Sequence, residues 1–465
     1  MRRFIVLLVF LFAACAPPPQ PIQPEITPEA QAVIVDGTLA TSLLATTWDS
    51  SPEDNALFPL DPSRGTALPG YEPIPLGYSS YSAFSSDWKT LAVVSFPTET
   101  AYHGSLLLID LSTWKTRKFE LDLQGWASAM VFSPDQTKLA IAHSDSDYHL
   151  SMVDVKQGKI TAQTEVDSFV SRLKFTRSGE TLMLYRPGAS VPGELSPAAP
   201  QVSLLAATDL SPRWSAGLEN VRDGIYPADE TVKTQVDLYK PGNALYFSPG
   251  LVFAPDQDVL YIAHADSAQL TTVDFDGQTI KTLNIQPKLS WFERLLSLDA
   301  GIAHAKVADG TSKQAAISPD GHSLYVVGTS RISFEDQQKG WQMEETPLGL
   351  DVIQTSDAYR VEHFETDATE LSLSSDGRFL YLRNWGDGIT LPWTEIFDTA
   401  SRKLSARKEA FYATPAPLLN GQYVLASTYV SMEEPEQNHM SVLQPSDLSV
   451  LAEWTGPSFI YWLTP

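Results

Sequence analysis

Two stretches of the chain place histidine and aspartate close together in the same pattern. Each reads Ile-Ala-His and continues with aspartate at alternate positions; the polar residues are His143, Asp145, Asp147, His264 and Asp266. Oxygen ligands suit calcium, and added imidazole suits a transition metal. A divalent metal is thus one interpretation. The one we favour is that these histidines cap strand ends by hydrogen bonding, because the chain has no zinc-type spacing and no EF-hand calcium loop.

The other candidates for a binding face are polar or aromatic residues between predicted strands. They are Arg186, Trp341, Asn384, Trp385, Asp387, Trp393 and Tyr429. Tryptophan anchors many interfaces, whereas single aromatics in β-proteins more often belong to the core. The sequence holds no His-Glu-x-x-His, Gly-x-Ser-x-Gly, phosphate-loop or dinucleotide-binding glycine pattern, so it assigns no catalytic residue.

The strands that must position these residues are marked by a repeated turn. Residues 316–327 read Ala-Ile-Ser-Pro-Asp-Gly-His-Ser-Leu-Tyr-Val-Val. Pro319 presets φ for the turn, Asp320 can bond its own backbone, and Gly321 can take the positive φ that closes a hairpin. The apolar run that follows is typical of a strand covered on both faces. Six further copies begin at Ala83, Val131, Lys174, Val252, Ser372 and Ala416.

A second hairpin follows most copies, with examples that begin at Leu106, Leu150, Leu270, Thr394 and Met440. Two hairpins make four antiparallel strands, and a repeat of roughly 40–50 residues is typical of propeller blades. Over residues 83–456 the repeats resemble those of the YVTN/TolB-type, WD40-like β-propeller family. The resemblance implies an all-β fold, a single β-propeller of four-stranded antiparallel blades. It implies no chemistry, since such propellers serve many functions.

The two ends of the chain bear on the number of blades. Thr41 to Trp48 and the segment from Ala56 look like strands without a full repeat, and residues 458–463 form a lone strand after the seventh copy. Three N-terminal strands and one C-terminal strand would complete a split blade. We therefore favour eight blades, with seven as the alternative, in a propeller domain of residues 31–465.

The N-terminus resembles a bacterial lipoprotein signal. Met1-Arg2-Arg3 precedes an apolar run from Phe4 to Phe12, and Ala13-Ala14-Cys15 follows. This run is too short to span a bilayer. We expect a signal peptide over residues 1–14, a lipidated N-terminus at Cys15, and a Pro-rich tether over residues 15–30. The protein would then sit at the bacterial cell envelope, outside the cytoplasm and anchored by lipid.

The net charge of the chain bears on which binding partners the protein could have. The 465 residues carry 56 acidic and 32 basic side chains, for a net charge of -24. This balance argues against nucleic acid and against binding to an anionic membrane surface other than through the lipid anchor. With a single cysteine, the chain can form no intramolecular disulfide.

Strand direction predicts which face of the disc is functional. The Ser-Pro-Asp-Gly turns and the third-to-fourth turns share one face, and the longer segments fall on the other, which we call the long-loop face: 186–200, 219–250, 286–313, 328–347, 384–393 and 428–439. Within one of them, residues 290–305 have the composition of a short helix. We expect a non-enzymatic binding or scaffolding module with a protein or glycan partner. The alternative is a metal-dependent, lactonase-like hydrolase.

Overall fold

The computed structural model describes the propeller region with gaps. The described residues are 43–48, 56–61, 66–96, 103–145, 147–188, 196–228, 231–234, 243–287, 310–336, 340–384, 391–410, 412–415, 424–428, 439–455 and 459–462. The predicted signal peptide and tether, the start of the domain at residue 31 and the predicted helix over 290–305 lie outside them. No helical segment in these residues is long and apolar enough to cross a membrane.

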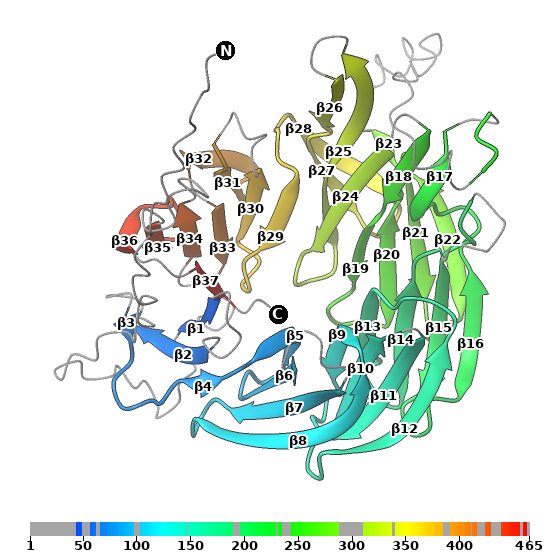
Figure 1. Cartoon of the computed structure of the whole chain (residues 1–465). Helices are drawn as coiled ribbons and strands as arrows, with labels where there is room; N and C mark the ends of the chain where they lie inside the picture. Colours follow the sequence, from blue (N-terminus) through cyan, green and yellow to red (C-terminus); the bar gives the residue numbers. More distant parts are fainter. Residues whose placement is uncertain are drawn as a thin grey trace, which may run out of the picture.

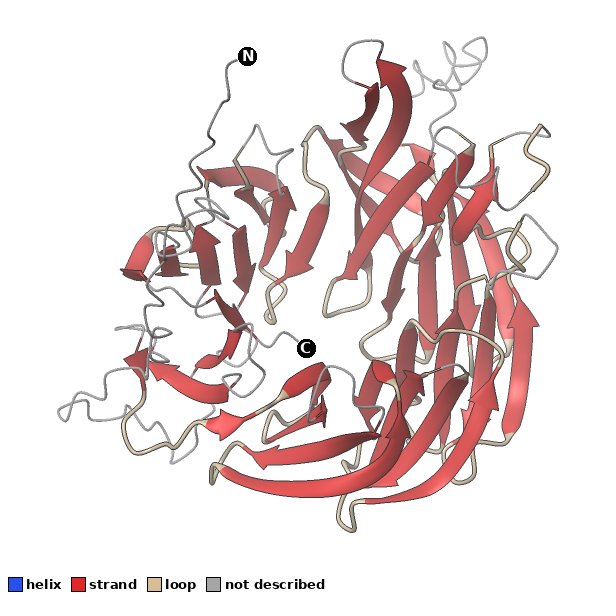
Figure 2. Ribbon diagram, in the orientation of Figure 1, coloured by secondary structure: helices blue, strands red, loops and turns tan. Residues whose placement is uncertain are grey.

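The described elements are β-strands, arranged as sheets around a central axis (Figures 1 and 2). The fold is therefore a β-propeller of four-stranded antiparallel blades, as predicted. In each blade the first strand lies nearest the axis and the fourth lies at the rim (Figure 1).

Five blades are complete, each built from four consecutive strands. They are β5 (Tyr78–Phe84), β6 (Thr90–Phe96), β7 (His103–Asp110) and β8 (Lys115–Gln124); β9 (Trp126–Phe132), β10 (Lys138–Ser144), β11 (Tyr148–Asp154) and β12 (Lys159–Val166); β13 (Arg172–Phe175), β14 (Thr181–Arg186), β15 (Gln201–Ala206) and β16 (Pro212–Gly217); β19 (Gly250–Phe253), β20 (Val259–Ala263), β21 (Gln269–Asp274) and β22 (Thr279–Asn284); and β29 (Glu370–Leu373), β30 (Phe379–Asn384), β31 (Trp393–Asp398) and β32 (Lys403–Glu409).

The remaining strands form three further sheets. One repeats the blade order with β33 (Tyr412–Pro415), β34 (Val424–Thr428), β35 (His439–Leu443) and β36 (Val450–Thr455), but residues 416–423 and 429–438 between them are outside the described part. A larger sheet contains β17 (Gly224–Pro227), β18 (Ala244–Ser248), β23 (Gln286–Pro287), β24 (Gly310–Ile317), β25 (Ser323–Asp336), β26 (Gly340–Pro347), β27 (Leu350–Gln354) and β28 (Tyr359–Phe364). The last contains β1 (Leu43–Trp48), β2 (Ala56–Asp61), β3 (Thr66–Ala67), β4 (Ile74–Pro75) and β37 (Phe459–Trp462).

Strand order explains the hydrophobic pattern of each repeat. The second strand β20 is buried along its whole length, whereas the fourth strand β12 alternates between exposed and half-buried residues. A middle strand is covered by the two adjacent blades, so both of its faces are apolar. The cores accordingly lie between blades: Val94 of β6 and Ile141 of β10 belong to one cluster of buried side chains.

The repeated turn has the predicted geometry. The Ser318 hydroxyl donates to Asp320 Oδ1 over 2.5 Å, and the Gly321 amide donates to the Ser318 carbonyl over 2.8 Å. Gly321 has a φ of +73°, in the left-handed region that favours glycine. The Ser374 hydroxyl repeats the bond to Asp376 over 2.7 Å in the β29–β32 blade.

These turns also contact one another around the ring. A Cβ atom on Gly377, at the β29–β30 turn, would lie 2.4 Å from Pro319 Cδ in the turn of the preceding blade. A Cβ atom on Gly179 would lie 3.4 Å from Pro134 Cδ in the same way. The motif therefore closes each hairpin and also packs one blade against the next.

The described residues contain five complete blades, whereas eight, or seven, were predicted, and the number eight stays a prediction.

One prediction needs correction. Residues 328–347 are not simply a loop, because β25 continues to Asp336 and pairs with β26 in a hairpin that projects from the blade (Figure 1). The expected meeting of the chain ends is seen, since β1 pairs antiparallel with β37 through Ala45 and Trp462.

The turn geometry predicts that valine in place of a turn glycine destabilises the protein, and that the loss of stability differs between two glycines. Gly321→Val should reduce the free energy of unfolding by roughly 1–2 kcal/mol, because a β-branched residue is forced into left-handed space. Gly377→Val should cost more, because its Cβ also meets Pro319. Urea denaturation measures both, with His322→Val at an exposed neighbouring position as control. Equal stability of all three variants would refute the turn assignment.

Candidate functional site

The two predicted histidines are buried and bonded within their own blades. His143 is 2% exposed and His264 is 0% exposed. His143 Nε2 lies 2.9 Å from the Ser151 hydroxyl, and His264 Nε2 lies 2.7 Å from the Thr271 hydroxyl. Both pairs join the end of a second strand to the third strand. The interpretation that these histidines form hydrogen bonds at strand ends therefore fits both residues.

The predicted aspartates are not brought together as a metal site. Asp145 and Asp147 are exposed in the β10–β11 turn, where the Asp147 amide donates to Asp145 Oδ1 over 3.1 Å. Asp266 lies on another blade and pairs with Arg222 Nε over 3.5 Å. In the part of the chain that is described, no group of three or more His, Cys, Asp or Glu side chains could hold a metal ion.

The other predicted residues are dispersed. Arg186 is buried, pairs with Asp167, and donates to Gln201 Oε1 over 2.7 Å. Asn384 donates to the Asp367 carbonyl over 2.6 Å. Trp393 is 3% exposed, so it belongs to the core and cannot anchor a partner. The Trp341 side chain and the residues Trp385, Asp387 and Tyr429 lie outside the described part of the structure.

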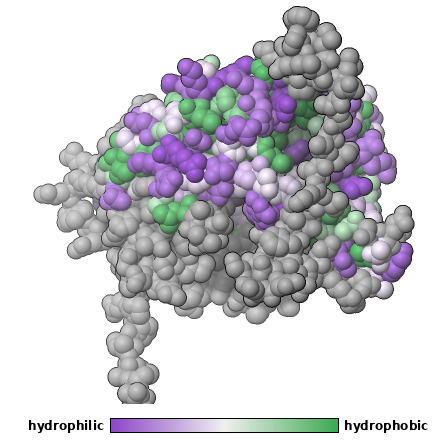
Figure 3. All heavy atoms as spheres, turned by 90° about the horizontal axis from the view of Figure 1, so that it is seen from above, coloured by the Kyte–Doolittle hydropathy of each residue, from purple (hydrophilic) through white to green (hydrophobic). Residues whose placement is uncertain are grey.

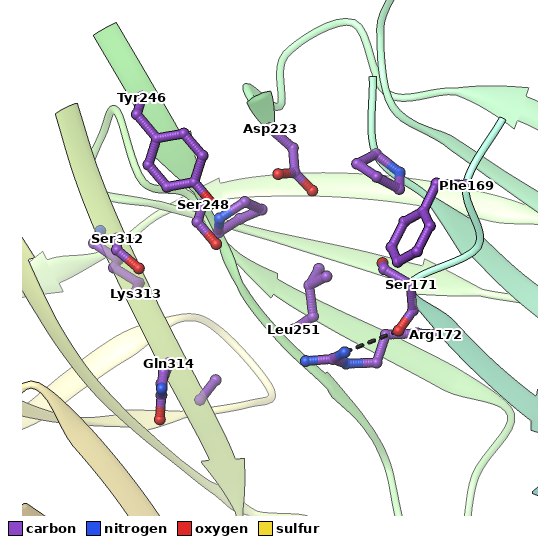
Figure 4. Close-up of a pocket in the computed structure, with 13 residues that line it drawn as sticks. Phe169, Ser171, Arg172, Asp223, Tyr246, Ser248, Leu251, Ser312, Lys313 and Gln314 are labelled. Atoms are coloured by element: carbon purple, nitrogen blue, oxygen red, sulfur yellow. Dashed lines mark hydrogen bonds between the residues drawn. The ribbon is translucent and has the colours of Figure 1, made fainter. Parts of the chain in front are cut away.

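A hollow of about 500 Å³ lies between the β13–β16 and β19–β22 blades, near the axis. Its walls include Phe169 and Arg172 at the start of β13, Asp223, Tyr246 of β18 and Lys313 of β24 (Figure 4). The strands β13 and β24 begin here and β14 ends here, so the hollow lies on the long-loop face. A cavity of this size suits a small ligand.

Asp223 carries the most perturbed carboxyl group of the hollow. Its Oδ2 atom accepts a hydrogen bond from the Tyr185 hydroxyl over 2.8 Å. Burial raises the pKa of Asp223 to about 6, although the bond from Tyr185 and the charge of Arg172 oppose the shift. A carboxyl group with a perturbed pKa inside a cavity is a common property of functional sites.

Lys313 crosses from β24 to the neighbouring blade. Its ammonium group donates to the His264 carbonyl and, over 3.3 Å, to the Ser267 carbonyl. Burial lowers the pKa of Lys313 to about 8. Gly328 makes room for this side chain, because a Cβ atom there would lie 2.9 Å from Lys313 Cγ. The ammonium group is thus engaged in holding the loop after β20, not presented as a nucleophile.

The side chain of Arg222 positions the segment that contains Asp223. The guanidinium of Arg222 lies 5.4 Å from the ring centroid of Tyr226 and 5.5 Å from that of Phe247. Its pairing with Asp266 links the same segment to the loop after β20. Asp266, a candidate binding-face residue from the sequence, therefore pairs with the segment that forms one wall of the hollow.

Sequence reasoning missed Asp223 and Lys313 because neither is part of the repeat. Both fall in segments predicted only as long loops of the functional face, 219–250 and 286–313. The one local signal was glycine at position 328. The equivalent positions of the other repeats hold polar side chains, which are Ser95, His143, Arg186, His264, Asn384 and Thr428. A glycine at such a position leaves space that another side chain can fill.

Comparisons with known proteins support the fold alone. No protein-family model matches the chain, and no curated protein matches it in sequence. A solved structure of the dihydro-heme d1 dehydrogenase NirN in complex with DHE has a TM-score of 0.54 at 12% identity, over 94% of this chain and 77% of that chain. The periplasmic gluconolactonase PpgL of Pseudomonas aeruginosa has a TM-score of 0.44 at 15% identity, over 91% of this chain and 99% of that chain. The likeness to NirN supports a β-propeller fold without indicating a function.

The raised pKa of Asp223 predicts a pH-dependent stability. Because the folded protein binds this proton more tightly than the unfolded chain, folding stability should fall as pH rises from 3.8 to about 6. Asp223→Asn removes the effect, so at pH 7.5 the variant should be more stable by about 1 kcal/mol after allowance for solvent screening. Thermal melts at pH 4.5 and pH 7.5 would measure it.

Asp209→Asn is the matched control. Hydrogen bonds from Ser211 lower the pKa of Asp209, so this substitution should not stabilise the protein at pH 7.5. An Asp223→Asn effect of equal size at both pH values would contradict the assignment of Asp223.

Proposed function

We propose that the protein is a non-enzymatic binding module of the bacterial cell envelope, anchored through a lipid on Cys15 and holding its ligand in the hollow on the long-loop face. The observation that carries this proposal is the hollow itself. It is a cavity of about 500 Å³ whose walls join polar and charged side chains from separate blades. Residues 1–14 would be the signal peptide, and residues 15–30 would tether the propeller to the membrane.

We further propose that the ring closes with eight blades. The pairing of β1 with β37 supports a split blade from both chain ends, and β24, β25, β27 and β28 follow the blade order within the larger sheet. A closed ring would give the hollow rigid walls. Pre-formed walls reduce the entropy lost when a ligand binds.

The lining favours a polar ligand, either a small molecule or the exposed end of a protein or glycan chain. Asp223, Arg172, Ser248 and Gln314 supply charge and hydrogen-bonding groups. Tyr246 supplies an aromatic ring that is 46% exposed beside them. Seen edge-on in Figure 3, the described surface mixes hydrophilic and hydrophobic residues, which suits a protein that is soluble apart from its anchor.

The alternative of a metal-dependent hydrolase receives less support from the residues described. Such an enzyme needs converging ligands and an activated water. Asp145 and Asp147 lie together on one turn, whereas Asp266 is paired with Arg222 on another blade. Asp223 is bonded to Tyr185 and has Arg172 as its nearby charge, which suits recognition of a polar group.

A photocrosslinking amino acid placed at Tyr246 tests the proposal in cells. With the lipid-anchored chain intact, we expect a specific crosslinked species from Tyr246, at the margin of the hollow. None should form from Gln157, which is also exposed and lies in the β11–β12 turn of the opposite face. Crosslinking from Gln157 but not from Tyr246 would place function on the short-turn face and refute the proposal.

A further inference from the structure

The hollow carries opposite charges on separate walls. Asp223 comes from the segment before β17, and Arg172 comes from the first residue of β13 (Figure 4). Leu251 lies between them in this view, as an apolar floor. The third charged residue, Lys313, directs its ammonium group to the carbonyls of His264 and Ser267. The charges presented to a ligand are therefore one carboxylate and one guanidinium.

Each charge suits a different ligand group. Asp223 is half-buried, and its described hydrogen bond is the one from Tyr185 to Oδ2. An ammonium group beside it would compensate a carboxylate that burial disfavours. Arg172 donates through Nη1 to the Ser171 carbonyl over 2.8 Å. A guanidinium has several donors in a planar fork, and this geometry matches the two oxygens of a carboxylate.

The remaining walls limit the size and character of the ligand. Tyr246 is 46% exposed and Phe169 is 41% exposed, and they stand at opposite margins of the hollow (Figure 4). Hydroxyl groups of Ser248 and Ser312 and the amide of Gln314 also line it. A volume of about 500 Å³ accommodates an amino acid or a short peptide.

We propose that the hollow binds a zwitterionic ligand of the amino acid or short-peptide class, with its ammonium group at Asp223 and its carboxylate at Arg172. This rests on the proposed function, because it assumes that the hollow is the binding site. Leu251 and the two aromatic rings would contact the apolar part of the ligand. Recognition of both ends explains why acidic and basic groups face one cavity without pairing in a salt bridge of their own.

Calorimetric titration of the mature protein at pH 7 tests the inference with four probes. They are L-alanyl-L-alanine, its N-acetyl form, its C-terminal amide, and the doubly capped dipeptide. Capping either end should weaken binding at least tenfold, since each cap removes one charge-assisted contact. In Asp223→Asn, N-acetylation of the dipeptide should no longer weaken binding, whereas amidation of its C-terminus should still weaken it. In Arg172→Gln, amidation should no longer weaken binding, whereas N-acetylation should still weaken it.

Asp209→Asn and Arg213→Gln are the matched controls, because they make the same charge changes on residues outside the hollow. In each control variant, N-acetylation and amidation of the dipeptide should both still weaken binding. Equal binding of capped and uncapped dipeptides, or no binding of any dipeptide, would overturn the inference. If Tyr246 still crosslinked in cells, that result would leave the proposed binding function in place. If Tyr246 did not crosslink, the proposed function would be refuted as well.

Discussion

The shape of the hollow depends on the hydrogen bonds that join the β13–β16 blade to the β19–β22 blade. At the short-turn face, the Arg177 amide donates to Asp258 Oδ1 over 2.9 Å, and the Lys174 ammonium donates to the Ala254 carbonyl. Asp258 is 6% exposed, and burial raises its pKa while burial lowers the pKa of Lys174. Buried polar groups of this kind are costly to leave without partners, so these contacts fix the two blades at one end.

At the opposite end the same two blades are separated by the hollow. There Arg222, in the segment that follows β16, pairs with Asp266 in the loop after β20, and Lys313 of β24 donates to the His264 carbonyl in that same loop. The hollow therefore lies where long side chains bridge the two blades, opposite the face where the turns of the blades contact each other directly. The two blades contact each other directly at the short-turn face and leave a hollow at the long-loop face. A ligand could occupy this hollow because packing of the blades leaves it open.

The fold was predictable because its signal is local and repeated. Gly321 and Asp320 specify their turn within four residues, and the same bonds recur in each blade that carries the motif. The site was not predictable in the same way. His143 and His264 were correctly placed at strand ends, but their side chains turn to Ser151 and Thr271 inside the blades. The position of Asp223 depends on contacts between blades, which no local pattern encodes.

A crystal structure of the mature protein grown with L-alanyl-L-alanine would show whether the hollow binds a zwitterion. We predict that the dipeptide lies in the hollow, with its ammonium group at Asp223, its carboxylate at Arg172, and its methyl groups over Leu251. A dipeptide bound elsewhere on the propeller, with only water in the hollow, would contradict it.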